Sequence, residues 1–282
     1  MSHTEQTTSN FHPNVDSQKL QENMAAIGRK ILVLSGKGGV GKSTVAVNIA
    51  AEYARKGNKV GLLDVDLHGP SVPRMIGLSG QKCFGFENQI MPLGVSDNLK
   101  VMSVAFLVPD DTQAVIWRGP MKYNVIQQLL ADTAWGELDY LVIDAPPGTG
   151  DEPLSVAQLV GTDAGAVIVT TPQKVAVEDV RRCITFCRQV KVPIWGIIEN
   201  MAGFLCPHCH KELNLFGTTS GGKELADQTG LDLLGRLLFD PVIADGADAG
   251  LTIPECSVTT DTHKKLDQII EKLTSNIHEE KN

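Results

Sequence analysis

Residues 35–44 read SGKGGVGKST and bring glycines, two lysines and hydroxyl groups together in one short stretch. Within it, Gly36, Gly41, Lys42 and Ser43 form the pattern G-x-x-x-x-G-K-S, between an apolar ILVL run and the segment TVAVNIAAEYARKG. A glycine-rich loop between a strand and a helix exposes several backbone N–H groups to one concave site, and the helix dipole adds positive charge there. This pattern therefore predicts a phosphate-binding loop.

Bulky side chains would keep the backbone away from a phosphate, which explains the glycines of this loop. Lys42 would neutralise the β and γ phosphates of a nucleotide, and the Ser43 hydroxyl would ligate Mg²⁺. A chance glycine-rich turn is the alternative, but it does not account for the flanking strand and helix. The predicted nucleotide-binding residues are Gly36, Lys37, Gly38, Gly39, Val40, Gly41, Lys42, Ser43 and Thr44.

Acidic residues follow two further apolar runs. In LDYLVIDAPPGTGD, Asp144 ends the run and precedes a Pro-Gly loop able to move with a γ phosphate, so we expect it to hold the water shell of the metal. In LLDVDLHGPS, Asp64 and Asp66 would point to one face if the strand continues through both. In such a pair, one carboxylate can hold the water shell of the metal and the other can position the attacking water. Two solvated strand-end carboxylates remain the alternative.

Two of the six cysteines have ligand spacing. Cys206 and Cys209 in LCPHCH are separated by two residues, which lets two thiolates face one metal ion or cluster. Two thiolates are half a ligand set, but a two-fold dimer would supply four, enough for a [4Fe–4S] cluster at the interface. A dimer-bridging zinc ion, a redox disulfide and a metal-free turn remain open alternatives. We expect His208 and His210 to be exposed rather than ligands.

The remaining cysteines have no such pattern. Cys183 and Cys187 are four residues apart on a predicted helix and fall on its apolar stripe, so we expect them to be buried core thiols. Cys83 and Cys256 lie in predicted loops.

Alternating strands and helices must position these residues. Short β-branched runs alternate with segments of helical period, which predicts βαβ units and a parallel sheet whose nearly continuous apolar strands are covered on both faces. The predicted strands are residues 30–35, 59–66, 99–105, 138–145, 164–171, 193–200 and 232–239. The predicted helices are residues 42–55, 121–133, 153–160, 175–190, 222–228 and 261–277.

Composition indicates where such a protein works. A hydrophobic content of 42% allows a large core, while no apolar run is long enough to cross a membrane. The first residues, MSHTEQTTSNFHPNVDSQ, lack the character of a signal peptide, so the cysteines are expected to be reduced thiols or metal ligands. We therefore expect a cytoplasmic protein with no membrane partner. A net charge of −8 without a basic block argues against a nucleic-acid partner.

The polar residues 1–25 lack an apolar period and are predicted to form a flexible tail ending in a short helix. No internal repeat or further boundary is visible after them. We therefore expect a single ATPase domain over residues 26–282.

The stretch KGGVGKST, with its early Lys37, resembles the deviant Walker A motif of the MinD, ParA, arsenite-pump ATPase and nitrogenase iron-protein class. The resemblance implies a P-loop NTPase fold, with a mostly parallel central β-sheet and helices on both faces. In that class the extra lysine reaches the phosphates of the partner subunit across a nucleotide sandwich dimer. Lys37 is thus expected to act in trans like an arginine finger, the alternative being a solvated surface residue.

Further stretches resemble the Mrp/ApbC family of iron–sulfur cluster carrier ATPases, from about residue 30 to residue 253. They are DVDLHGPSVPRMIG, WRGPM, DAPPGTGDEPLS, TTPQKVAVEDVRR, ENMAGFLCPHC and LFGTTSGGKELA. The resemblance implies that Asp66 positions the attacking water, Asp144 holds Mg²⁺ through water and Gly148 senses the γ phosphate. By the same resemblance Asn200 reads adenine, and the segment from Phe239 closes over the base.

The expected function is therefore an ATP-dependent carrier, a slow ATPase with Lys37, Lys42 and Asp66 as catalytic residues. It would hold a [4Fe–4S] cluster through Cys206 and Cys209 in a homodimer, receive it from a cluster donor and pass it to apoproteins. Two departures from the family pattern, no cysteine before Cys83 and no small domain before the ATPase, imply that its scaffold-type N-terminal cluster and its bacterial accessory domain are missing.

Two other functions compete with the carrier. A MinD- or ParA-like positioning switch with a zinc-bridged dimer would bind membrane or DNA. Its membrane-binding form should end in a basic amphipathic helix, whereas the chain ends in HKKLDQIIEKLTSNIHEEKN, with mixed charge. A nucleotide-binding scaffold with negligible turnover is the third possibility, since slow hydrolysis and none look alike in sequence.

Overall fold

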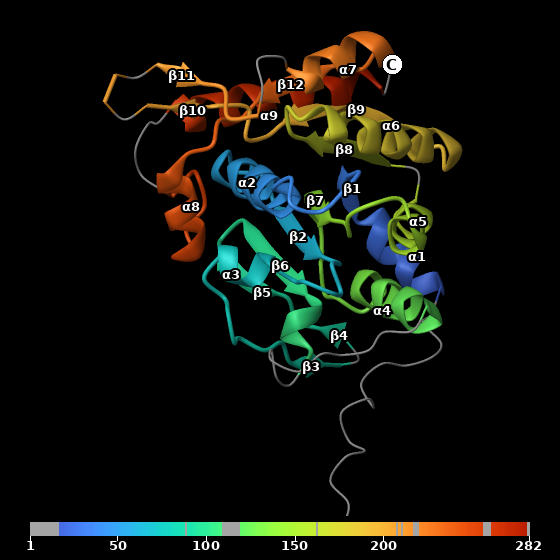
Figure 1. The fold of residues 1–282 in the computed structure, drawn as a ribbon. Coiled ribbons are helices and arrows are strands. Elements are labelled where there is room, and N and C mark those ends of the chain that lie inside the picture. Colours follow the sequence, from blue (N-terminus) through green and yellow to red (C-terminus); the bar gives the residue numbers. More distant parts are fainter. Residues whose placement is uncertain are drawn as a thin grey trace, which may run out of the picture.

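A mostly parallel sheet runs through the protein, as the computed structural model shows (Figure 1). The structure describes residues 17–87, 89–108, 119–161, 163–206, 208–209, 211–216, 220–255 and 261–280. The strands of the central sheet are β1 (Ile27–Ser35), β2 (Val60–Asp64), β5 (Leu93–Ser96), β6 (Leu99–Ser103), β7 (Leu138–Asp144), β8 (Ala164–Thr170), β9 (Ile194–Glu199) and β12 (Leu233–Arg236). Their order across the sheet is β12-β9-β8-β1-β7-β2-β6-β5, and only the β5–β6 pair is antiparallel.

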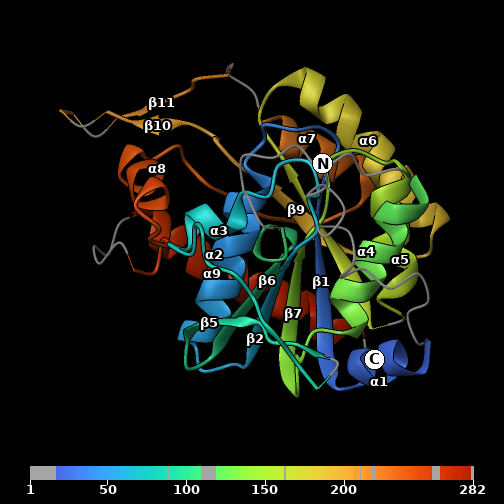
Figure 2. The same cartoon turned by 90° about the horizontal axis from the view of Figure 1, so that it is seen from below.

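Helices cover both faces of this sheet. They are α1 (Ser17–Ala25), α2 (Lys42–Arg55), α3 (Val72–Met75), α4 (Gly119–Ala131), α5 (Asp151–Leu159), α6 (Lys174–Gln189), α7 (Gly221–Thr229), α8 (Pro241–Asp248) and α9 (Asp261–Glu279), with a 3-10 turn at Val104–Phe106. Helices α2 and α9 lie on one face, and α4, α5 and α6 lie on the other (Figure 2). None of the helices in the described part of the chain is long and apolar enough to span a bilayer.

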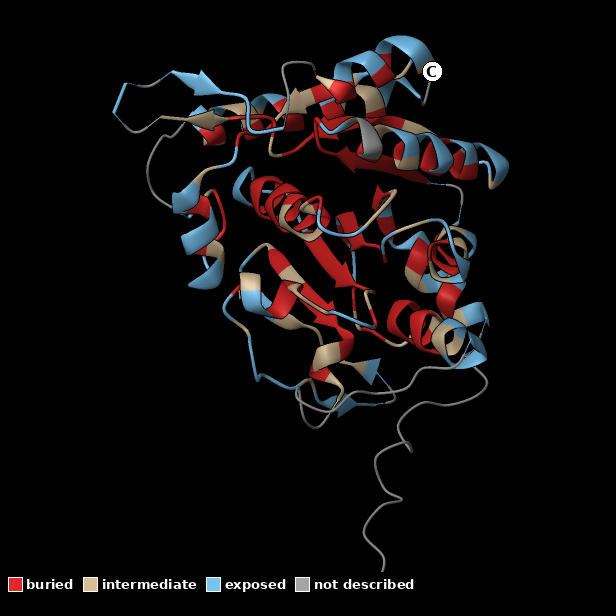
Figure 3. Ribbon diagram, viewed as in Figure 1, coloured by how far each residue is buried: buried red, intermediate tan, exposed pale blue. Residues whose placement is uncertain are grey.

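The core consists of the central strands and the inner faces of these helices (Figure 3). All seven residues of β8 are buried, as are the last six of β1. Strands covered by helices on both faces must be apolar on both faces, which is why these segments read as continuous apolar runs rather than alternating ones. Because these strands are packed on both faces, the polar residues at their ends are held in defined positions.

All seven predicted strands and all six predicted helices are present, with ends shifted by a few residues. The antiparallel edge strand β5 and the helices α3 and α8 were not predicted. Strand β5 is short and only partly buried, so it has little apolar pattern. Helix α8 did carry a start pattern, because Asp240 caps it and Pro241 occupies its first turn.

The short helix predicted before residue 26 packs against the fold. Residues 17–25 were assigned to a tail ending in a helix, and that helix is α1, but it packs against the fold rather than standing free. Leu20 and Met24 are buried in the core, and the Lys19 ammonium lies 2.6 Å from Asp132 Oδ1. The folded part therefore includes Ser17–Ala25, while residues 1–16 lie outside the described residues.

Candidate functional site: a nucleotide cleft and a cysteine hairpin

The predicted phosphate loop joins β1 directly to α2. Gly41 has φ +80°, a left-handed conformation that side chains other than glycine rarely adopt, and it caps the start of the helix. A Cβ atom at Gly41 would lie 2.1 Å from Asn200 Nδ2, because that amide packs against the loop and donates to Val40 O at 3.0 Å. Asn200, the residue that follows β9, therefore stabilises the conformation of the loop.

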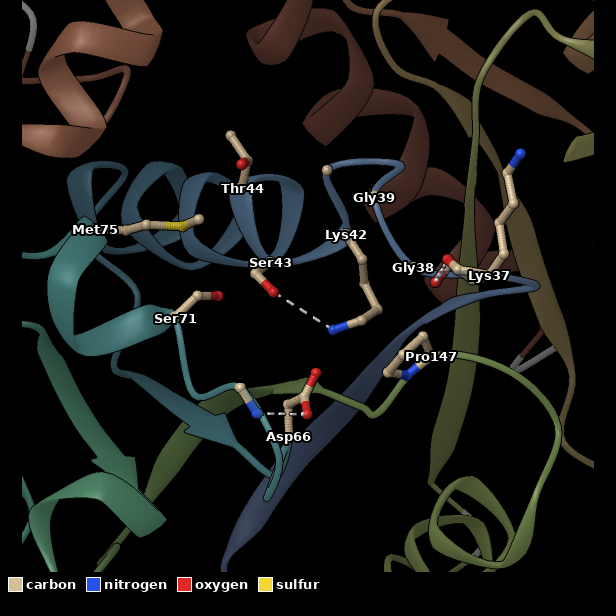
Figure 4. Close-up of a pocket in the computed structure, with 13 residues that line it drawn as sticks. Lys37, Gly38, Gly39, Lys42, Ser43, Thr44, Asp66, Ser71, Met75 and Pro147 are labelled. Carbon is tan, nitrogen blue, oxygen red and sulfur yellow. Dashed lines mark hydrogen bonds between the residues drawn. The ribbon is translucent and has the colours of Figure 1, made fainter. Parts of the chain in front are cut away.

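A cleft of about 210 Å³ opens in front of this loop (Figure 4). Its walls come from the loop, from the segment after β2, from α3 and from the segment after β7. They are Ser35, Lys37, Gly38, Gly39, Gly41, Lys42, Ser43, Thr44, Asp66, Gly69, Ser71, Met75 and Pro147. These distant segments meet because β1, β7 and β2 are parallel neighbours, so their carboxyl ends share one edge of the sheet.

At the bottom of the cleft, Lys42 forms a buried ion pair with Asp144. The Lys42 ammonium also lies 3.5 Å from Ser43 Oγ, and Asp144 is completely buried at the end of β7. Burial raises the pKa of the Asp144 carboxyl, against the lowering effect of Lys42. Among the described residues, Asp144 Oδ2 has no hydrogen-bond partner. A buried carboxylate with one oxygen left unpaired by the described residues thus lies beside the first residues of α2.

The two aspartates at the end of β2 have different environments. Strand β2 ends at Asp64, which lies opposite Asp144 in the β2–β7 register, is fully buried and accepts a hydrogen bond from Ser103 Oγ at 3.2 Å. Burial, followed by the charge of Asp144, raises the pKa of Asp64 to about 8. Asp66 lies beyond the strand and lines the cleft. The alternative of two solvated strand-end carboxylates is therefore wrong, because Asp64 is not accessible to solvent.

The Asp66 carboxylate is oriented by its own loop. Its Oδ1 accepts hydrogen bonds from the backbone N–H of His68 at 3.3 Å and of Gly69 at 3.2 Å. Close by, Lys122 of α4 contacts His68 Nε2 at 2.9 Å and Glu152 Oε1 of α5 at 2.5 Å. This cluster ties the Asp66 loop to the helix that follows the Pro-Gly loop, a link that no spacing in the sequence indicated.

Lys37 is partly exposed, and its side chain points away from Lys42 at the edge of the cleft (Figure 4). Within the described residues, its ammonium has no ion pair or hydrogen bond. The two lysines of the loop thus point in different directions, one into the cleft of its own chain and one outward.

The predicted base-side residues lie at the other end of the loop. Asn200 is almost fully buried against Val40, as described above, while Phe239 is 40% exposed. The Phe239 N–H donates to Gly203 O at 2.7 Å, which joins that segment to the chain leaving Asn200. Gly148 has φ +93°, and its N–H donates to Ser35 O at 2.9 Å. The roles of these residues toward adenine and γ phosphate remain predictions.

The two spaced cysteines lie on a small hairpin that projects from the sheet (Figures 1 and 2). Its strands are β10 (Phe204–Leu205) and β11 (Glu212–Leu213), and the Cys206 N–H donates to Lys211 O at 3.0 Å. Cys206 is partly exposed and Cys209 is exposed. The Cys206 sulfur accepts hydrogen bonds from the backbone N–H groups of Cys209 and His208 and from the Cys209 thiol, which lower the pKa of Cys206. This turn favours a thiolate and brings both sulfurs to one place.

No third potential ligand joins these two cysteines among the described side chains. His208 is exposed, as predicted, while His210 and Cys256 lie outside the described residues. Cys183 and Cys187 are fully buried in α6, as predicted, and burial raises the pKa of the half-buried Cys83 to about 11. Of the five cysteines that the structure describes, Cys206 and Cys209 therefore form the accessible pair.

The family model of the NUBPL iron-transfer P-loop NTPases matches residues 26–274. The chain belongs to this family. It is 46% identical to the iron-sulfur cluster carrier protein of Methanocaldococcus jannaschii over 257 residues, which cover 90% of this chain and 88% of the relative. It is 44% identical to the cytosolic Fe-S cluster assembly factor NUBP1 homolog of Caenorhabditis briggsae, covering 94% of this chain and 87% of that protein.

Solved structures share this fold. A nucleotide-binding protein from Archaeoglobus fulgidus, in complex with ADP, superposes with a TM-score of 0.74 at 40% identity, covering 84% of this chain and 92% of that one. The cell-division ATPase MinD of Pyrococcus furiosus superposes with a TM-score of 0.63 at 20% identity, covering 88% and 99%. The MinD likeness shows a shared P-loop NTPase fold, and the predicted fold class is confirmed.

Proposed function

We propose that this protein is an ATP-dependent iron–sulfur cluster carrier, which holds its cluster on Cys206 and Cys209 and delivers it to apoproteins. The observation that carries the proposal is the projecting hairpin, where two accessible sulfurs share one turn and hydrogen bonds within that turn lower the pKa of Cys206. The names of the two curated relatives, a cluster carrier and a cluster assembly factor, support the same activity.

The cluster would be shared by two copies of the chain. Two thiolates cannot satisfy a four-ligand cluster, and the described residues add no further ligand to them. A two-fold axis through the hairpins would bring four sulfurs together, so we propose a homodimer that bridges a [4Fe–4S] cluster. Only two exposed ligands per chain leave the cluster accessible, which suits its transfer from a donor to a recipient.

ATP would bind in the cleft in front of the glycine loop. Its phosphates would accept hydrogen bonds from the N–H groups of the loop and pair with the Lys42 ammonium. Lys42 would leave its ion pair with Asp144 to make that contact. Asp66, held by two backbone N–H groups, is placed to orient the attacking water. Lys37 points out of its own cleft and is proposed to reach the phosphates of the partner copy, so that hydrolysis requires the dimer.

The oxygen donors beside the phosphate loop fit Mg²⁺. The unpartnered Asp144 Oδ2 and the Ser43 hydroxyl are hard oxygen groups next to the phosphate loop, which is the ligand chemistry that this ion prefers. Ser43 would bind it directly and Asp144 through water. When bound, Mg²⁺ supplies neutralisation of the phosphate charge.

Metal analysis of the cysteine variants tests the carrier function. Anaerobically reconstituted protein should contain about two iron atoms and about two sulfides per chain, as expected for one [4Fe–4S] cluster per dimer. The Cys206→Ser, Cys209→Ser double variant should lose the iron and sulfide but still bind ATP, while the control Cys83→Ser keeps its cluster. Zinc in place of iron would support a zinc-bridged switch instead. A cluster retained by the double variant would exclude these two ligands.

A further inference from the structure

One arginine connects the cysteine hairpin to the sheet. Arg236, the last residue of β12, donates from Nε to Glu199 Oε2 at 2.8 Å and from a terminal nitrogen to Ala202 O at 2.9 Å. Its other terminal nitrogen lies 3.7 Å from Glu212 Oε1. These partners lie at the end of β9, on the segment that enters the hairpin and on the returning strand β11. A single guanidinium therefore joins both arms of the hairpin to one sheet end.

Glu199, the first of these partners, is fixed from several sides. Its carboxylate is completely buried and accepts hydrogen bonds from Ser220 Oγ at 2.9 Å and from the Gly222 N–H at 2.8 Å, besides Arg236. The next residue is Asn200, whose side chain donates to Val40 O in the phosphate loop. Adjacent residues thus contact the nucleotide loop on one side and the hairpin arginine on the other.

The chain between these two contacts is strained. Met201 has φ +53°, a left-handed conformation that costs free energy for any residue other than glycine. It separates Asn200 from Ala202, whose carbonyl Arg236 holds and whose N–H donates to Leu237 O at 2.8 Å. A single residue therefore separates the contact with the nucleotide loop at Asn200 from the contact with Arg236 at Ala202.

We propose that Arg236 is a positioning residue that couples the nucleotide cleft to the cysteine hairpin, an inference that rests on the proposed nucleotide-dependent carrier function. Nucleotide contacts at Asn200 or at the Phe239 segment shift the Glu199–Arg236 pair, and Arg236 shifts Ala202 and Glu212 with it. The orientation of the hairpin, and with it the exposure of Cys206 and Cys209, then depends on the nucleotide.

Thiol alkylation of the cluster-free protein tests this coupling. Cys206 and Cys209 are modified with N-ethylmaleimide with and without ADP, and each site is followed by mass spectrometry. In the unaltered protein, ADP should change the rate about fivefold or more, the lower end of ordinary allosteric coupling. In Arg236→Lys and Glu212→Gln, ADP affinity should stay unchanged while the ratio of rates falls to within about twofold of one.

The two variants separate coupling from folding. Lysine keeps a positive charge beside buried Glu199 but lacks the planar fork of donors with which Arg236 reaches three separate acceptors, so a merely structural Arg236 would be rescued by it. Glu212→Gln removes only the half-exposed hairpin contact and leaves the Glu199 pair in place. Glu271→Gln on the exposed side of α9 is the control, with a normal ratio expected.

Unchanged ratios in both variants, or no effect of ADP on the unaltered protein, would overturn the coupling. Alkylation needs no cluster, so the test is separate from that of the carrier. A third outcome is that the chain fails to bind iron while ADP still changes its alkylation rate and Arg236→Lys removes that change. This result would support the coupling and reject the carrier function.

Discussion

At the residue scale, the position of one aspartate relative to a strand end decides its chemistry. Asp64 is the last residue of β2 and is buried beside Asp144, whereas Asp66 lies just past the strand at the wall of the cleft. Identical side chains two residues apart thus become a buried group with a raised pKa and a carboxylate that faces the nucleotide site. Of the two, only Asp66 lines the cleft, which is why the proposed action on water is assigned to it.

We expect Asp66→Asn to bind ATP with unchanged affinity but to hydrolyse it at least about 100-fold more slowly, because an amide cannot accept a proton from water. The amide oxygen can still accept the backbone hydrogen bonds that orient the residue. Titration with ATP and single-turnover hydrolysis measure the two properties. Asp97→Asn, in an exposed turn, serves as the control, and normal turnover in Asp66→Asn would remove the residue from this role.

The raised pKa of Asp64 predicts a pH-dependent stability of the nucleotide-free protein. Between pH 3.8 and about 8 the unfolded chain has lost the Asp64 proton while the folded chain retains it. Raising the pH through this window therefore favours the unfolded state, and the stability contributed by protonated Asp64 is lost by about pH 8.

Asp64→Asn cannot titrate, so its free energy of unfolding should decline less between about pH 5 and about pH 8 than that of the unaltered protein. Urea unfolding at both pH values measures the difference. Asp227→Asn, an exposed position on α7, should follow the unaltered protein. Parallel pH dependence for all three proteins would contradict a protonated Asp64.

At the element scale, the glycine loop depends on a segment 160 residues away in the chain. The residue after β9 packs its amide on Gly41 and on the Val40 carbonyl, so the loop conformation is set by the strand order that places β9 near β1. The loop is thus pre-formed by tertiary contacts as well as by its own glycines.

Gly41→Ala should therefore lower the free energy of unfolding by more than the roughly 1–2 kcal/mol of a left-handed alanine, because its Cβ also collides with Asn200. Adding Asn200→Ala should relieve the collision and recover part of the loss, but not the backbone strain. Gly38→Ala is the matched control, since a Cβ there meets nothing within 4 Å. Chemical denaturation of the four proteins measures this order. Equal stability of the two glycine variants would argue against a tightly packed loop.

At the scale of the whole molecule, the proposed function gives both sites a second copy of the chain. The hairpin offers two sulfurs where a cluster takes four, and Lys37 points out of the cleft that its neighbours line. One dimer could satisfy both requirements, which would make cluster binding and hydrolysis depend on the same assembly.

Lys37→Ala should bind ATP but lose hydrolysis, because the partner cleft lacks the cation that stabilises the transition state. Mixing it with Asp66→Asn should restore part of the activity, since one cleft of each heterodimer then has both an intact Asp66 and a partner lysine. Steady-state hydrolysis of the mixture, with heterodimers verified by native mass spectrometry, measures the rescue. Verified heterodimers without activity would assign Lys37 to its own chain.

Much of this protein follows from its sequence. The glycine loop, the apolar strands and the two spaced cysteines are local patterns, and local patterns report backbone conformation and ligand spacing directly. They predicted every long element of the sheet. Of the nine residues assigned in the loop, all but Gly36 and Val40 line one cavity together with Asp66.

Tertiary structure decided what depends on distant neighbours. Three features join residues that lie close together in the fold but far apart in the chain: the burial of Asp64 beside Asp144, the packing of Asn200 on Gly41 and the contacts of Arg236. Residue spacing along the chain cannot predict these contacts, because they depend on the order of the strands in the sheet. That order is set by how the helices cover both faces of the sheet. The sequence thus determined which chemical groups are present, and the fold decided their protonation, their orientation and the connection between the two sites.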